Sequence, residues 1–250
     1  MRRLYSVVVV LAVAGSSASS PPAEARTQIA NVAAVPLVVV ELFQSQGCSS
    51  CPPANANVNA LAARPGVLAL SFAVTYWDYL GWKDRFAQPA FTERQRAYAR
   101  SGKSDGVYTP QVVINGSRAL VGANSVTLGK AIKAAGPLGG GPPLAREGST
   151  LKIGAGPIGA GPIRAGRTAV PATVLLVTYD PRERPVPIKA GENTGKTLPH
   201  RNIVTELKNA GTWSGKPIRI DLPRLADPEL RRAVLLQQGA GGQIIAALKL

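Results

Sequence analysis

Apolar residues in the first part of the chain fall in two continuous runs of strand length with a helical pattern between them. The runs are PLVVVELF (36–43) and VLALSFAV (67–74). Nearly continuous apolar runs such as these are typical of parallel strands covered on both faces. Between them, Val58, Leu61 and Ala62 share one helical face. The pattern predicts a strand, a helix and a parallel strand.

The next segments predict a second helix, a hairpin and a third helix. The second helix is expected to begin near Pro89. Two strands follow in TPQVVINGSRALVG (109–122), joined at Asn115-Gly116, a dipeptide typical of type I′ turns. In the third helix Ser125 is the expected N-cap and Gly136 the stop. Residues 26–136 are therefore expected to form an α/β domain whose central sheet carries an inserted helix.

The second half of the chain has a different pattern. Residues 137–166 are rich in Gly and Pro and include a short Ile-Gly-Ala-Gly-Pro repeat, which predicts a linker. Residues 167–250 contain short apolar runs separated by Gly and Pro, which predict a small, mainly antiparallel β domain. These runs are ATVLLVTYD, VPIKA, RNIVTELK, KPIRIDL, AVLLQQ and QIIAALKL. Residues 227–238 also fit a helix.

The N-terminal segment has the layout of a secretory signal peptide. Arg2 and Arg3 precede an apolar run, and small residues then lead to the cleavage pattern Ala23-Glu24-Ala25. The apolar run is shorter than the roughly 20 residues that a membrane span needs. We therefore expect residues 1–25 to be removed, leaving a periplasmic or secreted protein with no stable membrane span.

The chain is strongly basic, with a formal net charge of +15 that becomes +14 without residues 1–25. Such a balance often indicates a nucleic-acid partner. Here, however, the basic residues are scattered and no block of five like charges occurs. For an exported protein this pattern favours a solvated basic surface, and we expect no nucleic acid among its partners.

The only two cysteines lie in SQGCSSCPPA, as Cys48 and Cys51. The two prolines that follow are tolerated in the first turn of a helix, so the cysteines are expected at a helix N-terminus. The helix dipole there stabilises a thiolate, which makes Cys48 the expected nucleophile and Cys51 the resolving thiol. The spacing allows the sulfurs to pair while one stays exposed, and an oxidising compartment allows the bond to persist.

Three other positions are candidates for the same site. Thr109 and Pro110 begin a strand, and a cis bond between them would leave neighbouring backbone groups free to bind an incoming chain. Glu41 lies on the strand that leads to the cysteines, where a buried carboxylate could accept the proton of the resolving thiol. Its alternative interpretation is an ordinary polar position on the strand.

The loop YWDYLGWKD adds aromatic candidates beside the cysteines. Tyr76 and Trp77 could form the floor of a substrate groove, with Asp78 and Asp84 at its rim. Packing of these aromatic rings against the sheet is the favoured interpretation.

Together, a strand with a carboxylate, a C-x-x-C that opens a helix and a later Thr-Pro resemble a thioredoxin. Longer stretches resemble the exported thioredoxin-like family called domain of unknown function 1223. They are VELFQSQGCSSCPPANA, WDYLGWKDRFAQPAFTERQRAYA, VYTPQVVINGS and GENTGKTLPHRNIV. The resemblance covers residues 36–250 and implies a thioredoxin-like fold, but the family name assigns no activity.

The chain departs from that family at two positions. Where relatives typically read His-Val-Asp-Tyr-Trp-Asp, this chain has Ala73 in place of the His and Thr75 in place of the first Asp. A mechanism that needs either group is not expected here, whereas the two cysteines are unaffected.

Metal binding has little support in the sequence. Structural zinc needs four ligands, and the chain offers two Cys and His200. We expect no metal and no cofactor, and we expect His200 to be a hydrogen-bonded structural residue. Two thiolates could still hold Cu(I), although Met1 is the only methionine.

A thiol–disulfide oxidoreductase is therefore the leading interpretation. Its partner would be a thiol or disulfide of another exported protein, or a small thiol. The alternative is a secreted binding or scaffold module with a permanent Cys48–Cys51 bond, although such a short loop gains little from chain entropy. Glu192, Asn193 and Arg201 are expected only to form a hydrogen-bonded turn, and the oligomeric state stays open.

Overall fold

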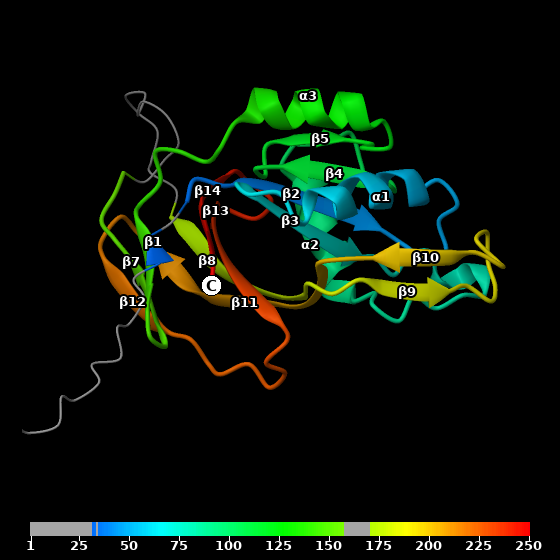
Figure 1. The fold of residues 1–250 in the computed structure, drawn as a ribbon. Helices are drawn as coiled ribbons and strands as arrows, with labels where there is room; N and C mark the ends of the chain where they lie inside the picture. The colour runs from blue at the N-terminus through cyan, green and yellow to red at the C-terminus, as the bar shows by residue number, and fades with distance from the viewer. Residues whose placement is uncertain (1–31, 34, 158–170) are drawn as a thin grey trace, which may run out of the picture.

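The computed structural model describes residues 32–33, 35–157 and 171–250 (Figure 1). The predicted signal peptide lies outside these residues. Within them the fold is mixed α/β, as predicted. Its α-helices are α1 (Pro52–Leu61), α2 (Pro89–Arg100) and α3 (Ser125–Ala135). A short 3-10 helix spans Asp78–Leu80.

The central element is an eight-stranded mixed sheet. In spatial order its strands are β14 (Ile244–Lys249), β13 (Arg231–Gln238), β8 (Ala172–Asp180), β11 (Ile203–Trp213), β3 (Val67–Ala73), β2 (Val38–Gln44), β4 (Gln111–Ile114) and β5 (Arg118–Leu120). β3 pairs in parallel with β2 and β11, and the other pairs are antiparallel. Every residue of β2 and β3 is buried, as their continuous apolar runs predicted.

Helices cover both faces of the β2–β3 region. Val40 and Leu42 of β2 pack in one core cluster with residues of α1 and α3. Val39 and Phe43 point to the other face and pack with residues of α2. Figure 1 shows α1 and α3 on one side of the sheet and α2 on the other. The strand alternation therefore separates the α1 face from the α2 face.

Two smaller sheets complete the fold. An antiparallel four-stranded sheet contains β1 (Val32–Ala33), β6 (Leu144–Glu147), β7 (Thr150–Ile153) and β12 (Ile218–Asp221). A separate hairpin contains β9 (Arg184–Pro187) and β10 (Thr197–His200). Hence β6 and β7 occupy part of the segment that was expected to be a linker.

The strands of the second half extend the central sheet of the first half. β11 joins β3 at the pair Ile203 and Ser71. Asn202 reinforces this junction, because its backbone C=O accepts a hydrogen bond from Ser71 N at 2.9 Å and its Nδ2 donates to Ala69 O at 2.7 Å. The division into domains at residues 136 and 167 remains a prediction, although one sheet includes strands from both sides of it.

Of the predicted turn at Asn115-Gly116 and the predicted N-cap of the third helix, the turn was confirmed and the cap was not. Asn115 and Gly116 have φ values of 50° and 65° and connect β4 to β5, as a type I′ turn requires. Gly116 is also needed for space, since a Cβ atom there would lie 2.5 Å from Gly242 O. The predicted N-cap Ser125 is wrong. Asn124 caps α3, because its Oδ1 accepts a hydrogen bond from Thr127 N at 2.9 Å.

The alternative helix at residues 227–238 is also wrong. This segment contains β13, whose residues pair with β8 on one side and β14 on the other. Burial between two strands decides the conformation here. None of the helices in the described part of the chain is long and apolar enough to cross a membrane.

Candidate functional site

Cys48 and Cys51 form a disulfide at the N-terminus of α1. Cys51 is the N-cap residue, and its C=O accepts a hydrogen bond from Asn55 N at 3.0 Å. Pro52 and Pro53 occupy the first turn. The prolines therefore position the helix start as the sequence predicted, directly behind the disulfide.

Both cysteines are buried, so the expectation that one sulfur is exposed is wrong. Cys48 is 0% exposed and Cys51 is 2% exposed, whereas Ser49 and Ser50 between them are exposed. Segments that are distant in sequence fold over the pair, which residue spacing alone does not reveal. Access to the sulfurs requires movement of one of these segments.

One covering segment is the β9–β10 loop (residues 188–196). Asn193 is 0% exposed, and its Nδ2 donates hydrogen bonds to the backbone oxygens of Gln46 and Cys48, each at 2.9 Å. Glu192 Oε2 accepts a hydrogen bond from Ser49 N at 2.9 Å. This bond lowers the pKa of the Glu192 carboxyl below its usual value. The loop thus binds the backbone on both sides of Cys48.

The contact with the disulfide is the main functional feature that sequence reasoning missed. The motif GENTGKTLPHRNIV contains both residues, but its sequence predicts only that Glu192 and Asn193 stabilise their own turn. A polar Glu-Asn pair far from the cysteines was the available signal. The fold connects the two regions, because Pro199 O in β10 accepts hydrogen bonds from Asn55 and Asn59 of α1 at 2.5 and 2.8 Å.

The aromatic loop holds the site from another side. Trp77 Nε1 donates a hydrogen bond to Thr109 Oγ1 at 2.7 Å, and Trp82 Nε1 donates to Gln46 Oε1 at 2.9 Å. Tyr76 and Trp77 are partly buried and pack against the core of the α2 face. The structure therefore places these rings as packing residues that also position the cysteine loop.

Thr109 and Pro110 lie beside the disulfide and are joined by a cis peptide bond. Ser50 Oγ donates a hydrogen bond to Thr109 O at 3.4 Å, and Ser50 Oγ also lies 3.4 Å from Cys48 Sγ. The structure therefore brings five of the predicted site residues together: the two cysteines, Thr109, Pro110 and Trp77.

Glu41 is not brought to the cysteines. Its side chain points to the α2 face of β2, where Oε1 accepts a hydrogen bond from Arg94 Nε at 2.7 Å. Its other oxygen accepts a hydrogen bond from the Tyr98 hydroxyl. Glu41 and Arg94 form a buried ion pair, with side-chain exposures of 0% and 6%. Both Glu41 oxygens therefore accept hydrogen bonds from α2, and within the described residues no hydrogen bond links Glu41 to Cys51.

Arg94 links this ion pair to the second half of the sheet. Its Nη1 donates to Gln237 Oε1 at 2.9 Å, and Gln237 Nε2 donates to the Tyr98 oxygen at 3.1 Å. Burial and the Glu41 carboxylate raise the pKa of Tyr98 well above its usual value. The network joins α2 to β2 and β13, and we assign it to stability.

Asp84 provides a buried carboxylate that contacts the cysteine loop. Its Oδ2 accepts a hydrogen bond from Gln46 N at 2.9 Å, and its Oδ1 accepts one from Phe86 N at 2.9 Å. Asp84 is only 1% exposed, so its expected place at the rim of a groove is wrong. Burial raises its pKa from 3.8 to about 6 despite these two bonds.

The raised pKa of Asp84 predicts a pH-dependent difference in stability between the wild type and Asp84→Asn. Folding favours the protonated carboxyl, so its stabilising contribution is present below pH 3.8 and is lost as the pH rises to about 6. We expect Asp84→Asn to gain about 2–3 kcal/mol relative to the wild type across this window. Urea unfolding at several pH values measures the difference.

The exposed Asp105 provides the control for this experiment, because Asp105→Asn removes the same charge at the surface. A difference between wild type and Asp84→Asn that stays constant with pH contradicts the prediction. The pKa of His200 is lowered from 6.5 to about 4 by burial and by Arg85. The free energy of unfolding that depends on His200 therefore increases with pH over this range, opposite to the effect of Asp84. His200 titrates in both proteins and cancels in the comparison.

His200 is not the hydrogen-bonded residue that the sequence predicted. It is 1% exposed, and neither ring nitrogen has a hydrogen-bond partner among the described residues. Its ring packs edge-on against Phe86 with the centroids 5.9 Å apart. The side chain therefore acts as a neutral packing group.

Two further findings concern metal binding and the family departures. Across residues 35–157 and 171–250 no group of three or more His, Cys, Asp or Glu side chains is arranged to hold a metal ion. Thr75 interacts with Thr92 through their hydroxyl oxygens, which are 3.0 Å apart. Ala73 is buried at the end of β3.

The fold and site define a mixed α/β protein with a covered C-x-x-C disulfide at a helix N-terminus. Residues 39–237 match the family described as protein of unknown function DUF1223. The chain belongs to this family, as the sequence resemblance indicated.

Two solved structures are similar to the chain. One is the crystal structure of a structural-genomics target protein from Agrobacterium tumefaciens, with 32% sequence identity and a TM-score of 0.67, covering 85% of this chain and 93% of that one. The other is HBP35 of Porphyromonas gingivalis, with 12% identity and a TM-score of 0.53, covering 86% and 74%. At that identity the second likeness concerns the fold alone. No curated protein matches the chain.

Proposed function

We propose that this chain is an exported thiol–disulfide oxidoreductase that works through Cys48 and Cys51. The observation that carries the proposal is the disulfide at the N-terminus of α1, with Thr109 beside it. No acidic residue lies in the first turn of α1, so the positive end of the helix dipole is available to a thiolate. Its partner is a thiol or disulfide of another exported protein, or a small thiol.

The reaction follows from the oxidised state of the pair. A substrate thiolate attacks Sγ of Cys48, a mixed disulfide forms, and the Cys48–Cys51 bond breaks as Cys51 leaves as a thiolate and takes up a proton. A second substrate thiolate then attacks the substrate sulfur and releases Cys48. The substrate loses two electrons and forms a disulfide, and the chain gains two thiols. The reverse sequence reduces a substrate disulfide.

The cover over the disulfide sets a condition for this reaction. Since Cys48 is fully buried, attack requires that the β9–β10 loop or the aromatic loop moves away. The β9–β10 loop is the better candidate for this movement. It is held to the cysteine loop by the Glu192 and Asn193 side chains, whereas Tyr76 and Trp77 of the aromatic loop also pack against the core. Opening of a hydrogen-bonded loop costs less than global unfolding.

The burial of both cysteines also favours a second candidate, a binding or scaffold protein with a permanent disulfide. Buried structural cysteines are generally inert to exchange. The two candidates differ in the pKa of the reduced Cys48 thiol and in the stability of the bond to reductants.

Trapping with Cys51→Ala tests the redox proposal. Once attacked by Cys48, a substrate cannot be released by Cys51, so we expect mixed disulfides with exported proteins to accumulate in the native envelope. Cys48→Ala is the matched control and is expected to trap far less, because Cys51 is the resolving residue. The trapped species are identified by mass spectrometry after non-reducing electrophoresis.

Titration of the reduced protein provides the second readout. A Cys48 pKa clearly below about 8.5 supports the proposal. A pKa near that value, together with a bond that resists excess glutathione and no trapped protein, supports the permanent disulfide instead. Copper that co-purifies with the wild type and is lost from Cys48→Ala would identify a Cu(I)-handling protein.

A further inference from the structure

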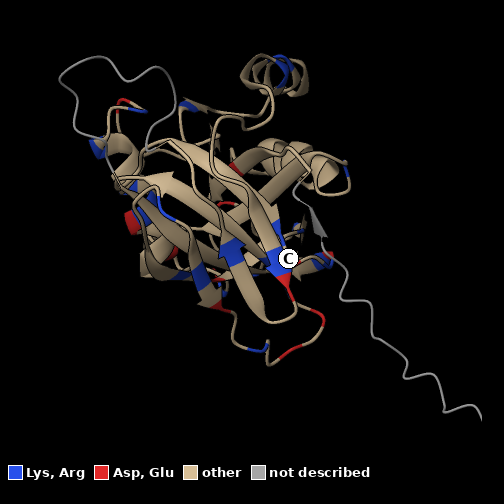
Figure 2. Ribbon diagram, turned by 90° about the vertical axis from the view of Figure 1, so that its left-hand side faces the viewer, with Lys and Arg blue, Asp and Glu red and all other residues tan. Residues whose placement is uncertain are grey.

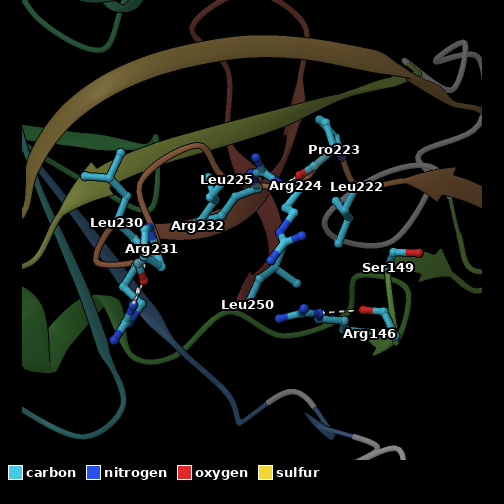
Figure 3. Close-up of a pocket in the computed structure, with 12 residues that line it drawn as sticks. Arg146, Ser149, Leu222, Pro223, Arg224, Leu225, Leu230, Arg231, Arg232 and Leu250 are labelled. Carbon is cyan, nitrogen blue, oxygen red and sulfur yellow. Dashed lines mark hydrogen bonds between the residues drawn. The ribbon is translucent and has the colours of Figure 1, made fainter.

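A second candidate site lies away from the disulfide, where the loop between β12 and β13 meets the β6–β7 turn and Leu250 (Figure 3). These segments line an open-sided cavity of about 660 Å³, within the usual size of small-molecule sites. Four arginines line it: Arg146, Arg224, Arg231 and Arg232. Figure 2 shows Lys and Arg spread over many elements of the fold, so a shared cavity distinguishes these four from the rest.

Three of the four guanidinium groups make at most one hydrogen bond within the described residues. Arg231 differs, because its Nη1 contacts the backbone oxygens of residues 228–230. By contrast, Arg146 donates one bond, from Nε to Gly148 O at 2.8 Å, and Arg232 donates one, from Nη1 to Pro223 O at 2.7 Å. Within the described residues the Arg224 side chain donates no hydrogen bond, and none of the four forms an ion pair with a carboxylate.

Arg232 provides an independent indication of a missing ligand. It is only 8% exposed, and its Nε has no hydrogen-bond partner in the described part of the chain. Burial and nearby Arg146 lower its pKa, although Glu206 acts in the opposite direction. The Glu206 carboxylate instead accepts a hydrogen bond from Thr178 at 3.2 Å. A buried cation without a counter-ion is costly, which an anion in the cavity would relieve.

Apart from Ser149, the remaining lining residues carry no polar side chain, and they indicate the other part of the ligand. Leu222 and Leu225 line the same cavity. In Figure 3 the side chains of Arg146 and Arg224 extend toward the space beside Leu250. The cavity therefore combines convergent guanidinium groups with an apolar wall.

We propose that this cavity binds an organic anion whose phosphate or carboxylate group lies among Arg146, Arg224 and Arg232. Its apolar part packs against Leu222 and Leu225. Guanidinium groups suit both head groups, because their paired N–H donors match two anionic oxygens. This site is separate from the disulfide and does not depend on the proposed redox function.

Calorimetric titration of the full chain with four probes tests the proposal: octyl phosphate, octanoate, inorganic phosphate and octanol. One of the two amphipathic anions is expected to bind at least about tenfold more tightly than inorganic phosphate, since burial of two methylene groups suffices for that. Tighter binding of octyl phosphate identifies a phosphate ester, and tighter binding of octanoate identifies a carboxylate. Octanol has no anionic group, so its affinity is expected to be no higher than that of inorganic phosphate.

A variant of Arg224 tests the site itself. Arg224→Gln is expected to weaken binding of the tighter anion about tenfold through loss of a charged hydrogen bond, without lowering the thermal midpoint. Arg118→Gln, on β5 at the other edge of the sheet, is the matched control because it removes the same charge from an exposed strand. Equal weakening in both variants, no detectable anion binding, or octanol binding as tightly as the anions overturns the proposal.

Discussion

Replacement of Arg94 by leucine is expected to lower the free energy of unfolding by about 3–5 kcal/mol. The substitution leaves the Glu41 carboxylate buried at 0% exposure without its ion-pair partner. It also removes the donor to Gln237 in β13. Urea unfolding of the wild type and Arg94→Leu at pH 7 measures the effect.

Two comparisons separate the ion pair from a general effect of losing an arginine. Arg96 pairs with Glu93 on the exposed surface of α2, with side-chain exposures of 50% and 55%, so Arg96→Leu is expected to cost less than about 1 kcal/mol. The double variant Glu41→Leu/Arg94→Leu is expected to recover part of the loss, because no unpaired charge remains. If Arg94→Leu and Arg96→Leu are equally mild, the network does not have the stabilising role that we assign to it.

The second large effect is expected from Asn193→Ala, which should speed reduction of the Cys48–Cys51 bond by dithiothreitol about 30-fold. The substitution removes the two hydrogen bonds to the backbone oxygens of Gln46 and Cys48. If the closed state is destabilised by about 2 kcal/mol relative to the open state, the population of the open state rises by this factor. Stopped-flow measurement of thiol release gives the rate.

Asn57→Ala is a close control for this experiment. Asn57 Nδ2 also donates to two backbone oxygens, those of Gly122 and Ala123 at 3.0 and 2.9 Å, but these lie away from the disulfide cover. Its reduction rate should stay within a few-fold of the wild type. Equal acceleration in both variants would show that general destabilisation, rather than the β9–β10 loop, controls access to the sulfurs.

Much of the first half of the fold could be predicted from the sequence, because its signals are local. The apolar runs at 36–43 and 67–74, the prolines after Cys51 and the dipeptide Asn115-Gly116 each specify an element through their own residues. Local signals also predicted that the cysteines lie at the start of α1. The prediction of Ser125 as the N-cap was wrong, because the neighbouring Asn124 is an equally good capping residue.

The face taken by Glu41 could not be predicted, for a different reason. In a strand that is covered on both sides, apolar residues occupy alternating positions on each face and give no sign of which helix lies where. Glu41 therefore fitted a position near the cysteines as well as one near α2. Only the position of Arg94 on α2, which follows β2 after α1, β3 and the 3-10 helix, decides between them.

The cover over the disulfide depends on pairing between distant segments. The pattern of residues 201–208 (RNIVTELK) favours a strand, but it does not show that this strand, β11, lies beside β3. The partner of a strand is determined by the packing of the complete sheet, so the approach of Glu192 and Asn193 to Cys48 was hidden. The oxidised C-x-x-C was foreseeable, and its burial was not.

The position of Asn193 also orders events during synthesis of the chain. It follows Cys48 by 145 residues, so the cysteines are made well before the residue that closes over them. At typical elongation rates the interval is about ten seconds or longer. During that time an oxidant can reach both thiols in the growing chain. The last third of the sequence, which contains Asn193, then closes over the two cysteines.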